Sequence, residues 1–187
     1  MAEFTSYERE RVEVLGEVLE SFVLGCPEDL HDFCLSVFDA NGISGIDPNK
    51  FYKAQQFLNA MKDIGQRTGR NMLTRIGERI AMRVKLPTGL DGLDAVFDGL
   101  NRGYHSKYRG GEIGHWKYEP QGLVGGLNRG IMVSTNHYCC AFDRGVLEGL
   151  AKRFRPDGIT DVVVRHDDSQ PCRKDGSDSC TYVISWM

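Results

Sequence analysis

The stretch that decides the fold is Asp157–Met187, DGITDVVVRHDDSQPCRKDGSDSCTYVISWM. Two segments of it, 159–165 and 181–186, alternate between apolar and polar residues as β-strands do. Between them, Asp175-Gly176 is a turn dipeptide, because glycine takes a positive φ without steric cost. The two strands are therefore predicted to pair, which would bring the two cysteines that bracket the turn close together.

Upstream of this stretch, apolar residues recur every three or four positions, which is the pattern of amphipathic helices. The predicted helices cover residues 6–24, 28–38, 47–65, 65–84, 89–104 and 142–154. From Tyr108 onward the sequence becomes rich in glycine, aromatic and β-branched residues, which predicts strands at 112–119 and 129–135. The expected fold class is α+β, with N-terminal helices packed on an antiparallel sheet of about four strands.

The composition is that of a globular protein, with 41% hydrophobic and 26% charged residues in a chain of 187. We expect one domain over 1–187, with a mainly helical part, 1–104, and a sheet-containing part, 105–187. A net charge of −3 argues against nucleic acid as a direct partner, because phosphate binding requires a basic surface. The charged start and the lack of a long apolar run predict a cytoplasmic protein without membrane insertion.

In a reducing compartment the six cysteines are expected to be thiols or metal ligands rather than disulfides. Cys139 and Cys140 are adjacent and point to different sides, so one of them at most would join Cys172 and Cys180 in a shared site. Three thiolates and one nitrogen or oxygen donor form a tetrahedral zinc site of the structural type. Inert buried thiols and thiol redox chemistry are the alternatives. The candidate fourth ligands are His166, Asp167 and Asp168.

A group of aromatic and histidine residues in the middle of the chain predicts a pocket for a small molecule. Such pockets are mostly apolar and contain a few polar groups that orient the ligand. The predicted lining residues are Tyr104, His105, Tyr108, His115, Trp116 and Tyr138. The sequence shows no nucleotide-binding fingerprint and no evident catalytic triad, which weakens the case for an enzyme.

The cysteine-containing segments resemble the 4-vinyl-reductase-like domain family over roughly residues 100–187. The resemblance lies in CAFDRGVLEG at 140–149 and CRKDGSDSCTYVISW at 172–186, because the family ends in C-x₃-G-x₃-C-x-[FY]. It implies a fold like the small subunits of the TRAPP vesicle-tethering complex, usually dimeric, and an aromatic effector in an enclosed pocket. It also implies zinc held by three cysteines, here Cys140, Cys172 and Cys180, and one carboxylate. The family's carboxylate position is Ser169 in this sequence, which leaves Asp168, Asp167 or His166 as substitutes.

A second, more distant resemblance is to haem-based nitric-oxide/oxygen-binding sensor domains. These domains have a similar length, an axial histidine after a Leu-Asn pair, and a later Y-x-S-x-R motif that grips the haem propionates. Here Leu100-Asn101 precedes His105 at a slightly different spacing, and Tyr104-His-Ser106-Lys-Tyr108 has tyrosine where the motif has arginine. The resemblance implies haem as an alternative cofactor.

The leading hypothesis is a sensor or regulatory domain that binds a small apolar or aromatic ligand and contains a structural zinc site. We expect a homodimer that acts in signal transduction through a separate output protein or domain. Three alternatives remain open: a haem or other metal-cofactor gas or redox sensor, a tetrapyrrole-related reductase, and a thiol redox switch.

Overall fold

This computed structural model describes residues 4, 6, 7, 11–84, 90 and 92–187 of the chain. In these residues six α-helices and two antiparallel sheets form an α+β fold, as the sequence predicts. The helices are α1 (Gly16–Gly25), α2 (His31–Ala40), α3 (Ala54–Thr68), α4 (Arg70–Arg83), α5 (Gly92–His105) and α6 (Cys140–Phe154). Two short 3-10 turns, η1 (Glu28–Leu30) and η2 (Arg173–Asp175), accompany them.

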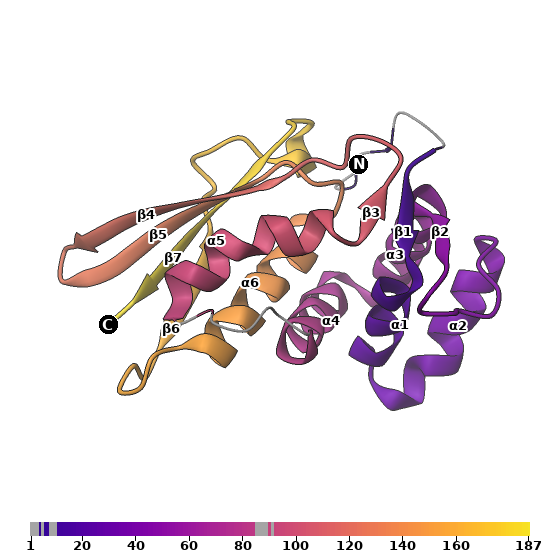
Figure 1. The fold of residues 1–187 in the computed structure, drawn as a ribbon, viewed down its shortest axis with the longest axis horizontal. Helices are drawn as coiled ribbons and strands as arrows, with labels where there is room; N and C mark the ends of the chain where they lie inside the picture. Colours follow the sequence, from indigo (N-terminus) through magenta and orange to yellow (C-terminus); the bar gives the residue numbers. More distant parts are fainter. Residues whose placement is uncertain (1–3, 5, 8–10, 85–89, 91) are drawn as a thin grey trace.

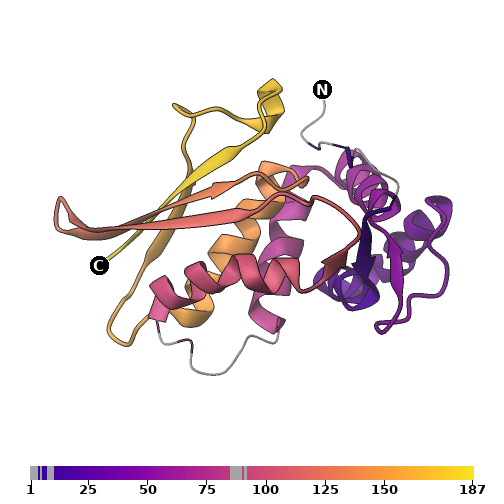
Figure 2. The same cartoon turned by 45° about the horizontal axis from the view of Figure 1, so that its top comes forward.

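The larger sheet has the strand order β4-β5-β7-β6 and carries α5 and α6 on one face (Figure 1). Its strands are β4 (Trp116–Val124), β5 (Leu127–Ser134), β6 (Val162–His166) and β7 (Cys180–Trp186). Figure 2 shows α1, α2 and α3 grouped at the far end of the molecule, beyond α4. The helices that cover this sheet are therefore the later ones, and the first three form a separate layer of the fold.

The four strands predicted in the second half of the chain form in this sheet, although β4 extends to Val124 and begins only at Trp116. β4 and β5 make a hairpin whose two connecting residues, Gly125 and Gly126, have φ of 59° and 83°. Positive φ at both central residues matches the right-handed twist of a two-residue hairpin, and glycine adopts it at no steric cost. β6 and β7 pair antiparallel, with Val164 opposite Ile184, and Gly176 in their connection takes the left-handed conformation expected of the Asp-Gly turn.

The packing of α4 along α6 depends on glycines that allow the two backbones to approach closely. A Cβ atom placed on Gly145 would lie 2.0 Å from the carbonyl oxygen of Thr74, and one on Gly149 would lie 2.4 Å from that of Glu78. On the other helix, a Cβ on Gly77 would lie 2.5 Å from the carbonyl oxygen of Phe142. No other residue fits these contacts without separating the helices, so α6 is held firmly against the N-terminal half.

The N-terminal region differs from the sequence prediction in two places. Residues predicted as the middle of a helix form β1 (Glu13–Leu15), which pairs with β2 (Phe51–Lys53) and β3 (Tyr108–Arg109) in a small sheet. A helix was expected from residue 47, but α3 begins only at Ala54. Pro87, which separates the predicted helices 65–84 and 89–104, lies outside the described residues.

The buried side chains form two clusters that meet where α5 and α6 approach the N-terminal helices. One cluster contains residues of α1, α2, α3 and α4, and the other lies between α5, α6 and the larger sheet. Tyr104 of α5 and Val146 of α6 pack against both clusters. The candidate functional residues lie around this junction.

Candidate functional site

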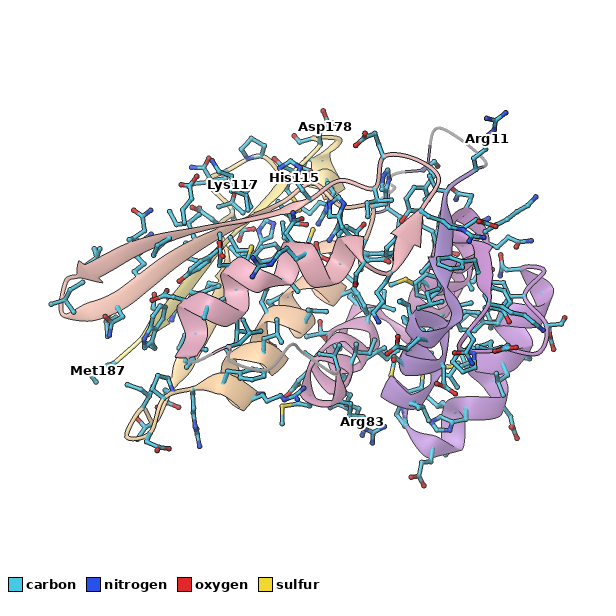
Figure 3. All side chains as sticks on the ribbon, viewed as in Figure 1. Arg11, Arg83, His115, Lys117, Asp178 and Met187 are labelled. Atoms are coloured by element: carbon cyan, nitrogen blue, oxygen red, sulfur yellow. The ribbon has the colours of Figure 1, made fainter. Side chains whose placement is uncertain are left out.

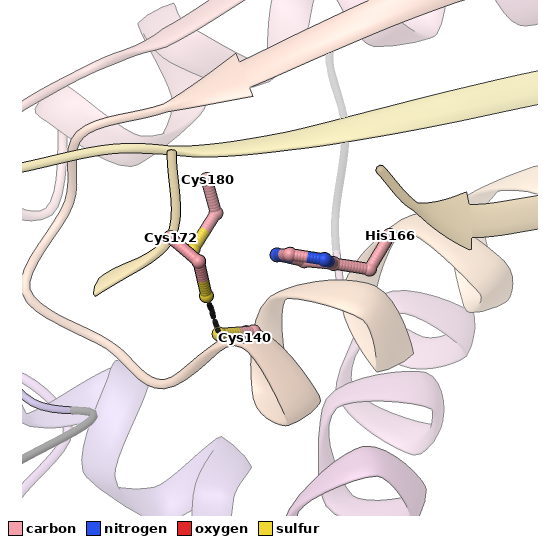
Figure 4. Close-up of side chains that lie close together, drawn as sticks. All are labelled: Cys140, His166, Cys172 and Cys180. Carbon is pink, nitrogen blue, oxygen red and sulfur yellow. Dashed lines mark hydrogen bonds between the residues drawn. The ribbon is translucent and has the colours of Figure 1, made fainter. Parts of the chain in front are cut away.

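Three cysteines and one histidine from four segments of the chain meet beside the larger sheet (Figure 4). Cys140 is the first residue of α6, and Cys180 is the first residue of β7. His166 is the last residue of β6, and Cys172 directly precedes η2. Because β6 and β7 are antiparallel neighbours, the end of β6 lies beside the start of β7.

The spacing of these side chains is that of a tetrahedral metal site. The Sγ atom of Cys140 lies 3.4 Å from that of Cys172 and 3.4 Å from that of Cys180, and the last two are 3.7 Å apart. With His166 included, all four ligand atoms lie within 4.8 Å of one another. Zinc–sulfur bonds of about 2.3 Å at tetrahedral angles place sulfurs roughly 3.8 Å apart. One zinc ion would thus reach all four residues after small adjustments.

His166 is the residue that completes the four-ligand set. Its Nδ1 atom lies 2.9 Å from a carboxylate oxygen of Asp168, and its Nε2 atom is buried without a hydrogen-bond partner. Metal-binding histidines usually donate their second ring N–H to a carboxylate in this way. Asp168 is therefore placed to orient the imidazole, whereas Asp167 accepts hydrogen bonds from Ser169. Among the fourth-ligand candidates, the geometry favours His166.

The pKa values of Cys140 and Cys180 are shifted in opposite directions. The hydrogen bond between the Cys180 and Cys140 thiols and the charge of Arg173 together lower the pKa of Cys180 to about 4, against the opposing effect of burial. The same hydrogen bond raises the pKa of Cys140. The thiolate form is therefore favoured at Cys180 over Cys140. Because metals bind thiolates, this shift favours metal binding at Cys180.

Cys139 takes no part in this cluster. It is fully buried in the N-terminal core cluster, whereas Cys140 packs against the cluster that contains Cys172 and Cys180. On the solvent side, a cavity of about 220 Å³ reaches Cys140, Cys172 and His166, and its other lining residues include Arg70, Arg144 and Lys174. The cluster is therefore accessible from solvent through a basic opening.

A buried ionic network lies directly behind the cysteines. Arg173 follows Cys172, and its guanidinium forms an ion pair with Asp143 in which both side chains are fully buried. Its Nη1 atom also donates to the side-chain oxygen of Asn136 at 2.7 Å, and Asn136 donates to Asp143 at 2.9 Å. The backbone N–H of Tyr138 donates to the same Asn136 oxygen at 2.9 Å. The network thus connects the cysteine loop to α6 and to Tyr138.

Tyr138 in turn lines an apolar cavity of about 580 Å³ at the junction of the two core clusters. Residues of α1, α3, α4, α5 and α6 line the cavity, together with Trp116 of β4 and Tyr108 of β3. Lys107 and Glu17 form a half-exposed ion pair of 2.5 Å along its lining. This volume is within the ordinary range for small-molecule pockets.

Four of the six residues predicted to form a pocket line this cavity: Tyr104, Tyr108, Trp116 and Tyr138. The other two lie outside it. His105 is exposed at the end of α5, and His115 is exposed and contacts Thr135 through Nδ1 at 3.0 Å. Figure 3 shows His115 on the side of the larger sheet away from α5. The sequence places the six residues near one another along the chain, but it does not indicate which way each side chain faces.

Sequence reasoning also missed the residues of the ionic network and the aliphatic part of the cavity wall. Arg173 lies in the run Arg-Lys-Asp and reads as an exposed turn residue, and Asn136 and Asp143 carry no motif. In the sequence, the aliphatic residues of the wall are apolar positions of predicted helices like any others. The apolar faces of α4 and α6 could be recognised, but the sequence does not show which of their residues leave space between the helices.

No family model matches the sequence, and no curated protein is significantly similar to it. Solved structures of H-NOX domains share its fold. A doubly substituted Tt H-NOX is 12% identical, with a TM-score of 0.63, over 92% of this chain and 94% of that one. A mutant of T. tengcongensis H-NOX is 13% identical, with a TM-score of 0.58, over 91% and 96% of the two chains. A Cs H-NOX mutant is 15% identical, with a TM-score of 0.58, over 92% and 96%.

At this level of identity the likeness establishes the fold alone. It agrees with the more distant of the two resemblances in the sequence, that to haem-based nitric-oxide/oxygen-binding domains. The resemblance to the 4-vinyl-reductase-like family and to the TRAPP subunits finds no support in these comparisons. The α+β architecture expected from that resemblance is nevertheless present, because both families combine helices with an antiparallel sheet.

Proposed function

We propose that this chain is a small-molecule-binding sensor domain of the H-NOX fold. Its ligand would occupy the apolar cavity lined by α1, α4, α5 and α6. The observation that carries this proposal is the cavity itself, because about 580 Å³ of apolar space at a junction of two cores is not needed for packing and normally serves binding. The shared fold supports the sensor role, since H-NOX neighbours include an oxygen complex.

A structural zinc site is the second part of the proposal. Cys140, Cys172, Cys180 and His166 would hold the ion, and four protein ligands leave no open position for a substrate. The ion would fix the start of α6 to the ends of β6 and β7. Arg173 lies next to Cys172 and forms an ion pair with Asp143 of α6. Because α6 also lines the cavity, the zinc site would help to hold this part of the cavity wall in place.

The experiment that tests the function is native mass spectrometry of freshly purified protein, followed by extraction of what is bound. We expect one zinc ion per chain and one small organic ligand, which is lost when Val146→Trp fills the cavity. A protein that retains the same organic ligand after this substitution would place the binding site elsewhere. A protein without zinc whose thiols oxidise reversibly would favour the redox-switch alternative.

Haem is the second candidate ligand, because one H-NOX neighbour is described in terms of haem redox potential and another as an oxygen complex. The location and apolar character of the cavity are compatible with a flat macrocycle. An absorption spectrum of the purified protein distinguishes the cases, since bound haem absorbs strongly in the visible range. A tetrapyrrole-related reductase remains a further proposal, tested by turnover of a vinyl-bearing tetrapyrrole.

The partner predictions are tested separately. A homodimer predicts twice the chain mass in light scattering, and signalling requires an output protein or domain that responds to the ligand. No helix in the described part of the chain is both long and apolar enough to cross a membrane.

A further inference from the structure

The charged residues and the serines of the cavity lining lie together at one side of the cavity. Glu17 and Ser21 are one turn apart on α1 and therefore share a helix face. Arg102 and Ser106 are one turn apart at the end of α5, where the Ser106 backbone N–H donates to the Arg102 carbonyl at 3.0 Å. The ion pair between Lys107 and Glu17 joins the two groups. These five residues are half-buried or exposed, and they form the mouth of the cavity.

The rest of the lining is apolar or aromatic. Phe57, Ala81, Phe142 and Leu150 belong to it and are buried, so solvent does not reach them. Gly103 lines the cavity beside the mouth, and a Cβ atom placed on it meets no heavy atom within 4 Å, so the space there is open. A ligand in this cavity would therefore meet charged groups at the mouth and apolar surface inside.

The mouth contains one cation without an acidic partner in the described part of the chain. Lys107 is paired with Glu17 at 2.5 Å. Arg102 has neither an ion-pair nor a hydrogen-bond partner among the described residues, and Asp98, one turn earlier on α5, is exposed and does not line the cavity. The Ser21 hydroxyl likewise makes no hydrogen bond to a described residue. The mouth thus offers a guanidinium and a hydroxyl to the polar group of a ligand.

The end of α5 does not oppose an anion at this position. The last carbonyl groups of a helix carry partial negative charge when they are left unpaired. Here the Arg102 and Gly103 carbonyls accept hydrogen bonds from the backbone N–H and the hydroxyl of Ser106, at 3.0 and 2.7 Å. The Tyr104 carbonyl accepts one from the Lys107 N–H at 3.1 Å. An anion beside Arg102 would therefore not face these oxygens unpaired.

The interior offers none of the common ligands for a metal ion. Among the described lining residues there is no histidine, cysteine or methionine, and His105 next to the lining residue Tyr104 is exposed. The Tyr104 hydroxyl donates to the Ile113 carbonyl at 2.6 Å. Burial raises the pKa of Tyr104 and of Tyr138, which disfavours the tyrosinate that would bind iron. The interior would therefore hold a ligand by apolar contact, and polar recognition would occur at the mouth.

We infer that the cavity binds an amphipathic carboxylate. The apolar part of the ligand occupies the interior, and its carboxylate lies at the mouth, where Arg102 and Ser21 donate hydrogen bonds to it. A single negative charge matches the single unpaired cation, and a guanidinium suits a carboxylate because its N–H groups can donate in parallel to both oxygens. The inference rests on the proposed ligand-binding function and specifies the chemical class of the ligand. It also assigns a role to Glu17, whose pairing with Lys107 limits the mouth to one free cation.

The first test compares three probes with the same ten-carbon chain: decanoate, 1-decanol and decylammonium. Isothermal titration calorimetry at pH 7 and low ionic strength measures their affinities, because salt screens exposed charges. We expect wild-type protein to bind decanoate about two- to fivefold more tightly than 1-decanol, which is the usual value of an exposed ion pair. Decylammonium should bind most weakly.

Three variants assign the preference to the mouth. Arg102→Gln should abolish the preference for decanoate over 1-decanol, because it removes the free cation. Arg75→Gln is the matched control, since Arg75 is exposed on α4 and does not line the cavity, and here the preference should persist. Glu17→Gln should increase the preference, because Lys107 loses its partner and becomes a second free cation. Opposite effects of two substitutions at the same mouth cannot arise from a general loss of folding.

The second test locates the chain of the ligand. Octanoate has two methylene groups fewer than decanoate and should bind about 15-fold more weakly, at roughly fourfold for each buried methylene. Equal affinity for octanoate and decanoate would place the chain outside the apolar interior and overturn the inference.

The outcomes separate the inference from the function on which it rests. Equal affinity for decanoate and 1-decanol, tightest binding of decylammonium, or a preference that Arg102→Gln does not change would refute the carboxylate and leave the cavity as a binding site. Failure of all three ten-carbon probes to bind folded wild-type protein would refute the proposed function and the inference together.

Discussion

Arg173 and Asp143 form an ion pair that solvent does not reach, with both side chains completely buried behind the cysteine cluster. It joins the loop that carries Cys172 to the helix that begins with Cys140. Removing one member leaves an isolated charge in a medium of low polarity, which is more costly than losing the attraction alone.

The first prediction follows from this pair. Arg173→Met should lower the free energy of unfolding by about 3–5 kcal/mol, because Asp143 is then left buried without its cation. Urea denaturation followed by circular dichroism measures the change. Lys152→Met is the control, since the Lys152–Glu78 pair is largely exposed and its loss should cost no more than about 1 kcal/mol. Similar costs for the two variants would show that the buried pair has no special role.

The second prediction distinguishes the adjacent cysteines. Cys140→Ala should remove the bound zinc, because it deletes one of the four ligands at the cluster. Cys139→Ala should retain one zinc per chain, because that thiol lies in the other core cluster. Metal analysis by mass spectrometry after gel filtration reads out both variants. Retention of zinc in Cys140→Ala would contradict the proposed ligand set.

The third prediction concerns the residue that orients the histidine. Asp168→Asn should weaken zinc binding by about 10- to 100-fold, because a residue that hydrogen-bonds a metal-binding histidine commonly has an effect of this size. Competition with a chromophoric chelator measures the affinity. The neighbouring Asp167→Asn leaves the Asp168–His166 contact untouched and should have little effect. If both substitutions act equally, the effect is one of surface charge.

The fourth prediction uses two glycines on different helices. Gly145→Ala should destabilise the protein by about 1–3 kcal/mol or more, since the added methyl group would collide with the backbone of α4. Gly103→Ala should instead stabilise α5 by up to about 1 kcal/mol, because alanine favours the helix and the methyl group enters open space. Thermal unfolding of the two variants gives the comparison, and a destabilised Gly103→Ala would mean that the space is already filled.

Periodicity in the sequence was sufficient for the long elements. The apolar spacing of α5 and α6, and the alternation of β6 and β7, are properties of single segments and predicted these elements closely. The small sheet was missed because β1, β2 and β3 contain two or three residues each, too few to show alternation. The helix expected from Asp47 begins only at Ala54, because the preceding residues form a turn and strand β2, and the Tyr52 hydroxyl accepts a hydrogen bond from the Asp47 backbone N–H there.

The candidate site was predicted in part for the same reason. The spacing of Cys172 and Cys180 around a turn is a local property, so the sequence indicated their proximity. The identity of the fourth metal ligand depends on how the end of β6 lies beside β7, which no local pattern in the sequence reveals. The sequence therefore left three candidate residues for this ligand. The orientation of His105 depends on the phase of α5 against the cavity, and Gly103 carries no chemical signal of its own.

The central claim is that the cavity between α1, α4, α5 and α6 is the ligand-binding site. A calorimetric titration of decanoate into wild-type protein and Val146→Trp tests it most directly, with Val163→Trp on the exposed part of β6 as the control. The account predicts one binding site in the wild type and in Val163→Trp, and none in Val146→Trp that folds normally by circular dichroism. Undiminished binding by folded Val146→Trp would contradict it.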